Sequence, residues 1–144
     1  MKKINIIILI IYTIILIIVS ITVMQKRPDI ENIYLSSDRD SSFDKLKQNN
    51  NYYFDSRNLD IYLIIEVKHL TTEDEIKVEW EKIENSSYKI IQKNIVNPEQ
   101  KGSGKIIISL VKKNDMYPPG NYNVRIYLNG SSKISKKFYI SDKI

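Results

Sequence analysis

The sequence predicts an all-β domain, a seven-strand antiparallel sandwich, preceded by one transmembrane helix. The helix is indicated by the run from Ile4 to Met24, which is 21 residues without a charged side chain. The sandwich is indicated beyond residue 52, where apolar and polar residues alternate in short segments separated by turn-prone residues. Because 144 residues suffice for one domain, we divide the chain into a transmembrane signal anchor at residues 1–27 and a β domain at residues 28–144.

The apolar run has the length and composition of a membrane span. At 1.5 Å per helical residue it would extend about 31 Å, close to the hydrocarbon core of a bilayer. It has no polar face, it is too long for a signal peptide, and no A-x-A-like cleavage site follows it. We therefore expect residues 4–24 to be retained in membrane lipid, with a cleaved signal peptide as the alternative.

The charges around this run set the expected orientation. Lys2 and Lys3 precede it and Lys26 and Arg27 follow it, so the Lys/Arg count is balanced and the short N-terminal tail favours an inside N-terminus. The prediction is a single-pass protein of the cell membrane with an extracytoplasmic C-terminal domain. Without these four residues the net charge of +5 falls to +1, which argues against nucleic acid as a partner.

The first part of the β domain is mostly polar. Residues 28–51 contain one short apolar stretch, Ile30 to Leu35, which predicts a first strand. Ser36 to Ser42 and Lys45 to Asn51 have loop composition.

Six further segments between residues 52 and 144 have strand periodicity. They are Asp60 to Lys68, Ile76 to Glu81, Tyr88 to Val96, Lys105 to Lys112, Tyr122 to Asn129 and Ile134 to Ile140. Asn129-Gly130 predicts a tight hairpin between the last two, because both residues tolerate positive φ. Each strand has one apolar face, so two packed antiparallel sheets are expected, with a closed barrel as the alternative.

The end of the chain resembles a known family. The stretch from Tyr117 to Gly130, followed by Phe138-Tyr139-Ile140, is similar to the closing hairpin of bacterial and archaeal extracytoplasmic immunoglobulin-like domains. The strand around Val78-Glu79-Trp80 also suits that family. The resemblance implies a seven-strand antiparallel immunoglobulin-like sandwich that acts as an accessory or interaction module, and it implies fold more than function.

Three groups of residues invite a chemical reading, and each has a simpler one. His69 is the only histidine and no serine follows a nucleophile pattern, so we expect a solvated loop histidine. Asp38, Asp40 and Asp44 could offer oxygen ligands to calcium, but their spacing is not that of an EF-hand, so a solvated loop is favoured. Gly102 to Lys105 lacks the spacing of a phosphate-binding loop and predicts a hairpin loop.

The aromatic residues could serve packing or binding. A binding platform would consist of Trp80, Tyr88, Tyr122 and Tyr127. Trp80 shares its strand face with Ile76 and Val78, which predicts core packing. Tyr62, Tyr127 and Tyr139 have outward parity, so a cluster of these three is the best candidate for a contact surface.

The sequence predicts a non-enzymatic, membrane-anchored module for protein or surface interaction. Alternatives are an accessory subunit of a larger membrane complex and a small-ligand binder. We expect membrane lipid and a protein as partners. We expect no catalytic residue, cofactor, metal site or nucleic-acid partner.

Overall fold

The computed structural model describes residues 2–25, 27–48, 52–56 and 60–142, and it describes side chains of the first helix from Ile6 to Ile21. The elements are α1 (Lys2–Gln25), β1 (Asp29–Ser36), α2 (Phe43–Gln48), β2 (Tyr53–Asp55), β3 (Ile61–Leu70), β4 (Ile76–Glu84), β5 (Ser87–Val96), β6 (Gly102–Leu110), β7 (Gly120–Leu128) and β8 (Ser131–Ser141).

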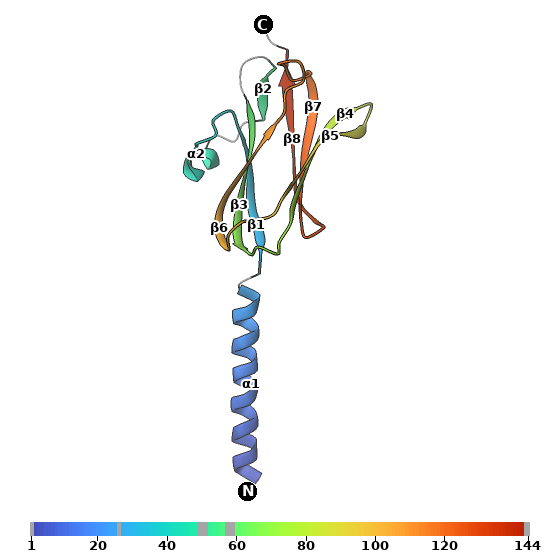
Figure 1. Cartoon of the computed structure of the whole chain (residues 1–144). Helices are drawn as coiled ribbons and strands as arrows, with labels where there is room; N and C mark the ends of the chain where they lie inside the picture. Colours follow the sequence, from blue (N-terminus) through green and yellow to red (C-terminus); the bar gives the residue numbers. More distant parts are fainter. Residues whose placement is uncertain (1, 26, 49–51, 57–59, 143–144) are drawn as a thin grey trace.

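The strands form two sheets that pack face to face (Figure 1). The smaller sheet has the order β1-β3-β6, and the larger sheet has the order β2-β8-β7-β4-β5. Neighbouring strands are antiparallel except β2, which runs parallel to β8. Figure 1 shows α1 standing apart from the strands, at the end of the β domain where β1 begins.

One hydrophobic core lies between the sheets. The smaller sheet contributes residues such as Leu63 and Ile65, and the larger sheet contributes Trp80, Val124 and Ile126, all of them fully buried. These residues occupy alternate positions of their strands, as the period-two pattern requires, although intervening side chains such as Ile64 are also buried, on the other face of the sheet. Burial of this shared apolar surface is the main stabilising contribution to the sandwich.

Two tight hairpins connect strands of the larger sheet. Asn129 and Gly130 both have positive φ and join β7 to β8, which confirms the predicted turn. Asn85 and Ser86 also have positive φ and join β4 to β5. Ser86 is an unusual residue for this conformation, which side chains with a Cβ adopt at some energetic cost.

Side chains tie the two sheets together where no backbone ladder does. The buried hydroxyl of Tyr117 accepts a hydrogen bond from the Ile61 backbone N–H (3.1 Å) and donates one to the Leu110 carbonyl (3.0 Å). The Gln92 side chain joins β5 to β6, and the Lys136 ammonium donates to the Ile33 carbonyl of β1 at 2.8 Å. Gln92 and Lys136 therefore join the two sheets at both sides, whereas the Tyr117 hydroxyl bonds two neighbouring strands of the smaller sheet, β3 and β6.

The structure corrects the predicted strand count. All seven predicted segments are strands, but the sandwich has eight strands, so the seven-strand immunoglobulin-like architecture is wrong. The additional strand, β2, has only three residues, too few to show alternation. The short helix α2 was not predicted either, and Gly102 to Lys105 begins β6 instead of forming a hairpin loop.

The structure also corrects the predicted anchor. Of the helices within the described residues, neither has the length and apolar character needed to cross a membrane. The expectations of a transmembrane signal anchor at residues 1–27, a single-pass topology and a cell-membrane location are corrected accordingly.

The β domain should fold without α1. The described side chains of α1 are all about half exposed, and none of them belongs to the core between the sheets. We expect residues 28–144 to give a β-type far-UV circular dichroism spectrum. Their free energy of unfolding in urea should match that of the β domain in the full chain within about 0.5 kcal/mol. Loss of a cooperative transition in the shortened chain would contradict this independence.

Candidate functional site

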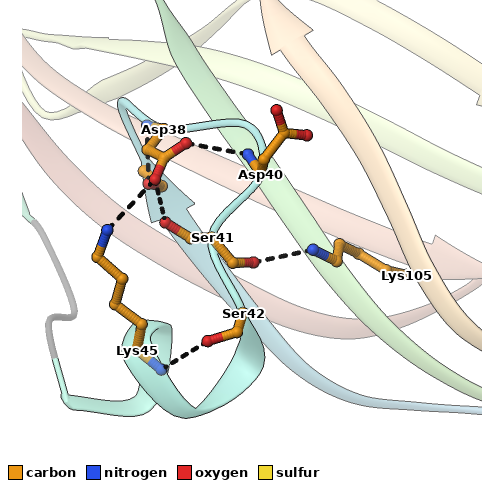
Figure 2. Close-up of polar contacts among 7 residues, drawn as sticks. Asp38, Asp40, Ser41, Ser42, Lys45 and Lys105 are labelled. Atoms are coloured by element: carbon orange, nitrogen blue, oxygen red, sulfur yellow. Dashed lines mark hydrogen bonds and ion pairs between the residues drawn. The ribbon is translucent and has the colours of Figure 1, made fainter.

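The aspartate-rich loop after β1 is held together by its own hydrogen bonds (Figure 2). Asp38 accepts bonds from the Asp40 backbone N–H at 3.0 Å and from the Ser41 hydroxyl at 2.9 Å, and Lys45 Nζ lies 3.4 Å from its carboxylate. These contacts lower the pKa of Asp38, and the hydrogen bond from Ser41 makes the largest contribution. The carboxylate is thus used to shape the loop.

The rest of this loop connects it to α2 and the smaller sheet. The Ser42 hydroxyl accepts a bond from the Lys45 backbone N–H, which caps α2, and Lys105 Nζ donates to the Ser41 carbonyl at 2.8 Å (Figure 2). Asp44 lies in the first turn of α2, where a negative charge is favourable. Among the residues that the structure describes, no group of three or more potential ligands could hold a metal ion.

His69 lies at an irregular point near the end of β3. Its side chain is exposed, its φ is 52°, and its backbone N–H donates to the Ser103 hydroxyl at 3.1 Å. The pairing of β3 with β6 shifts between Val67 and Leu70, so the backbone there is bulged. The histidine is solvent-exposed as expected, although it belongs to a strand and not to a loop.

The predicted aromatic surface is not assembled. Tyr62 lies on β3 in the smaller sheet, whereas Tyr127 and Tyr139 belong to the larger one. Within the larger sheet, Tyr139 pairs with the start of β7 and Tyr127 lies near its end. Trp80 is fully buried, which confirms its core assignment and removes it from any surface platform.

A different set of outward-facing residues does come together, on the two central strands of the larger sheet. We call this set the charged face. It consists of Lys77, Glu79 and Glu81 on β4 and Asn123, Arg125 and Tyr127 on β7. The register places the three pairs directly opposite one another, so their side chains are neighbours.

Glu79 is the centre of the first half of the charged face. Its carboxylate lies 2.9 Å from Lys77 Nζ and accepts a 2.9 Å bond from the Tyr127 hydroxyl. The same ammonium lies 3.7 Å from the centre of the Tyr127 ring. The pKa of Glu79 is lowered, mainly by the contact with Lys77 and further by the Tyr127 hydrogen bond, although burial of the carboxylate acts in the opposite direction. The charge of Glu79 is therefore fixed in place.

Glu81 is the centre of the second half. Asn123 Nδ2 donates to its carboxylate at 2.6 Å, and an Arg125 nitrogen lies 3.5 Å from the same oxygen. Glu81 is 4% exposed and Asn123 is 2% exposed. An outward-facing carboxylate this well covered needs such partners, because an unpaired one would be costly.

An apolar edge adjoins the charged face. Three residues of β5 form this edge: Tyr88 lies opposite Ile83 of β4, Ile90 opposite Glu81, and Ile95 opposite Lys77. Their side chains are 46–54% exposed. The Arg125 guanidinium lies 5.9 Å from the centre of the Tyr88 ring, linking the two areas. The larger sheet thus presents fixed charges of both signs beside exposed aromatic and aliphatic side chains.

This arrangement is suited to contact and not to bond chemistry. The carboxylates of the charged face are each engaged by a cation or an amide, and no nucleophile with an adjacent base occurs among its six residues. Sequence reasoning placed the β4 members outward but missed the cluster. The sequence does contain a sign of the cluster, because polar residues occupy every second position in both 77–81 and 123–127. This pattern identifies a shared surface only when the pairing of β4 with β7 is known.

Comparisons with known proteins give a weak structural likeness and no family. No family model matches the sequence, and no curated protein does. Among solved structures, it is similar to Pseudomonas fluorescens alkylpurine DNA glycosylase AlkC bound to DNA containing an abasic site analog, with 12% identity and a TM-score of 0.45. The similarity covers 83% of this chain and 32% of that one, so this chain spans about a third of that structure. A likeness at this level carries no argument about function.

Proposed function

We propose that this chain is a non-enzymatic β-sandwich module that binds a partner protein through the outer surface of its larger sheet. One observation carries the proposal: Tyr88, Ile90 and Ile95 are exposed side by side with a charged face whose groups are already held in position. Aromatic residues and arginine are enriched where proteins bind one another. Charges held before binding lose little freedom on contact, which favours affinity and selectivity.

A protein partner fits this surface better than a nucleic acid does. The carboxylates of Glu79 and Glu81 lie among the cations of the same surface, which are Lys77, Lys93, Arg125 and Lys137, and they interrupt the single-sign field that phosphate backbones require. Its apolar part lies at one side, as expected for a contact with an apolar centre and a polar rim. The partner surface should therefore be apolar opposite Ile90 and carry charges complementary to Arg125 and Lys77.

Position-specific photo-crosslinking in the producing cells tests this proposal. A photoreactive residue at position 88 or 95 should give one discrete adduct with a partner protein. The same residue at position 32, which is exposed on β1 in the smaller sheet, should give none. Arg125→Glu should reduce the adduct by about tenfold, because it places a third negative charge beside Glu79 and Glu81.

The matched control is Lys47→Glu, which makes the same kind of charge reversal at an exposed position of α2, on the side of the smaller sheet. It should leave the adduct unchanged. Equal crosslinking from position 32, or an adduct that survives Arg125→Glu, would show that the outer surface of the larger sheet is not the contact.

A further inference from the structure

The free edge of β5 is a second binding feature, distinct from the outer surface. Within the described residues, β5 pairs only with β4, so it ends the larger sheet. Alternate residues of an edge strand direct their backbone N–H and C=O groups away from the sheet. In Figure 1, the β4–β5 hairpin leans away from the other strands, which leaves this edge open.

A β-bulge explains why the hairpin leans away. The register shifts between Trp80, which pairs with Gln92, and Glu81, which pairs with Ile90, so Ile91 is the extra residue. A bulge bends its strand and increases the local twist. Residues 87–91 are therefore separated from β6, whereas Gln92 remains bonded to it.

Gln92 shows that the neighbouring backbone accepts a peptide-like group. Its side-chain amide donates to the Ser109 carbonyl at 2.9 Å and accepts from the Val111 N–H at 2.8 Å. A peptide group of an adjacent strand would make the same two kinds of bond. From Ser87 to Ile91, no described side chain makes a hydrogen bond of this kind to bridge β5 and β6.

A cleft of about 240 Å³ lies beside this open edge. Apolar side chains of Ile91 and Val111 line it, and both are well exposed, at 43% and 71%. Lys89 and Lys113 also line it, and neither forms an ion pair with a described residue, whereas Lys82 is paired with Glu84 at 3.0 Å. The cleft thus combines an apolar wall with two available positive charges.

We propose that the edge of β5 from Ser87 to Ile91 receives an extended acidic segment of the partner protein by β-strand addition. The backbone of that segment pairs with β5, one apolar side chain contacts Ile91 and Val111, and acidic side chains meet Lys89 and Lys113. Five residues of β5 extend about 16 Å, enough for a strand of four to five residues. This inference rests on the proposed function, because its occupant belongs to the partner protein.

Charge decides between this occupant and a second copy of the chain. β5 contains Lys89 and Lys93 and no acidic residue. Two antiparallel copies of β5 centred on Ile91 would bring Lys89 of one close to Lys93 of the other, and like charges across strands are unfavourable. An acidic segment instead neutralises the lysines.

The test uses the full chain, kept in a mild non-ionic detergent because α1 is apolar on all described sides. The probe is a fluorescein-labelled peptide with the sequence acetyl-Ile-Glu-Val-Glu-Ile-Glu-amide, and binding is followed by fluorescence anisotropy. We expect saturable binding that weakens by about tenfold with Lys89→Glu plus Lys113→Glu. The matched double variant Lys101→Glu plus Lys133→Glu, at exposed positions outside the cleft, should bind within about twofold of the parent chain.

Two further probes separate strand addition from simple charge attraction. A peptide of the same composition that is N-methylated at alternate residues cannot donate backbone hydrogen bonds along one edge, so it should not bind. A version with lysine in place of glutamate should also fail. Equal binding of the N-methylated peptide, or equal binding to the Lys89/Lys113 variant, would overturn the inference.

A second copy at this edge would also overturn it. In that case the chain would dimerise in analytical ultracentrifugation, and the Lys89→Glu plus Lys113→Glu variant would change the dimerisation. The acidic peptide would not bind. The proposed function is judged separately by the crosslink from position 95, which lies outside the segment from Ser87 to Ile91, and by the loss of that crosslink in Arg125→Glu. That crosslink would persist if strand addition alone were wrong.

Discussion

Replacing Trp80 by alanine should lower the free energy of unfolding by about 3–5 kcal/mol, the usual cost of truncating a buried large aromatic residue. Its ring is fully buried and meets Phe138 edge-to-face at 6.0 Å between centroids. Domains of this size have only about 5–15 kcal/mol to lose, so the variant should be close to unfolded. Urea denaturation followed by circular dichroism measures the change, because the variant lacks the only tryptophan.

Two variants control this experiment. Trp80→Phe keeps a ring against Phe138 and should cost clearly less than Trp80→Ala, since a smaller cavity remains. Tyr88→Ala removes an aromatic ring that is 46% exposed and should cost less than about 1 kcal/mol. In the parent chain, Trp80 emission should be blue-shifted and resist acrylamide. Emission typical of water-exposed indole would refute the core position.

Alkaline pH should destabilise the domain through Tyr122. Burial raises the pKa of Tyr122 to about 12, with a smaller contribution from the charge of Glu84. In the unfolded chain this pKa is about 10, so between about pH 10 and 12 the unfolded state loses its proton first. The stabilisation is complete below about pH 10 and is lost as pH rises through the folded pKa. A difference of about two pKa units corresponds to about 3 kcal/mol, measured as the fall in urea stability across this range.

Tyr122→Phe identifies the source of this loss. It keeps the ring stacked on Phe138 at 5.3 Å and removes the hydroxyl that donates to the Pro118 carbonyl. The variant should be about 1 kcal/mol less stable at neutral pH, with a shallower decline above about pH 10. Burial also raises the pKa of Tyr117, so part of the decline should remain. An unchanged slope in Tyr122→Phe would contradict the assignment, and Tyr139→Phe is the exposed control.

Period-two alternation was enough to locate seven of the eight strands, because each of these buries one face against the same core. It could not locate β2, whose three residues pair with β8 from far away in the sequence. It could not give the strand order either, since alternation states which face is buried and not which strand is adjacent. The helix prediction treated hydrophobic length as sufficient, and the described part of α1 did not meet the requirement for a span.

The candidate site was less predictable than the core. The outward parity of Glu79 and Glu81 was visible, but their burial depends on Asn123, Arg125 and Tyr127, which are more than 40 residues away and become neighbours through pairing. The bulge at Ile91 also left no mark in the pattern, because an extra residue in an apolar pair reads as continued strand. Residues whose role arises from register can be identified only after the register is known.

The positions at which the chain enters and leaves the β domain have a mechanical consequence. The chain enters the β domain through β1 in the smaller sheet and leaves it through β8 in the larger sheet, at opposite ends of the molecule (Figure 1). Tension applied to the two ends would therefore pull β1 past β8, and no backbone ladder joins these strands. Side-chain contacts, among them the Lys136–Ile33 and Gln92–Ser109 hydrogen bonds, and the apolar packing between the sheets would carry that load. Under tension, the two sheets should slide apart before either ladder breaks, so the domain would lengthen at low force.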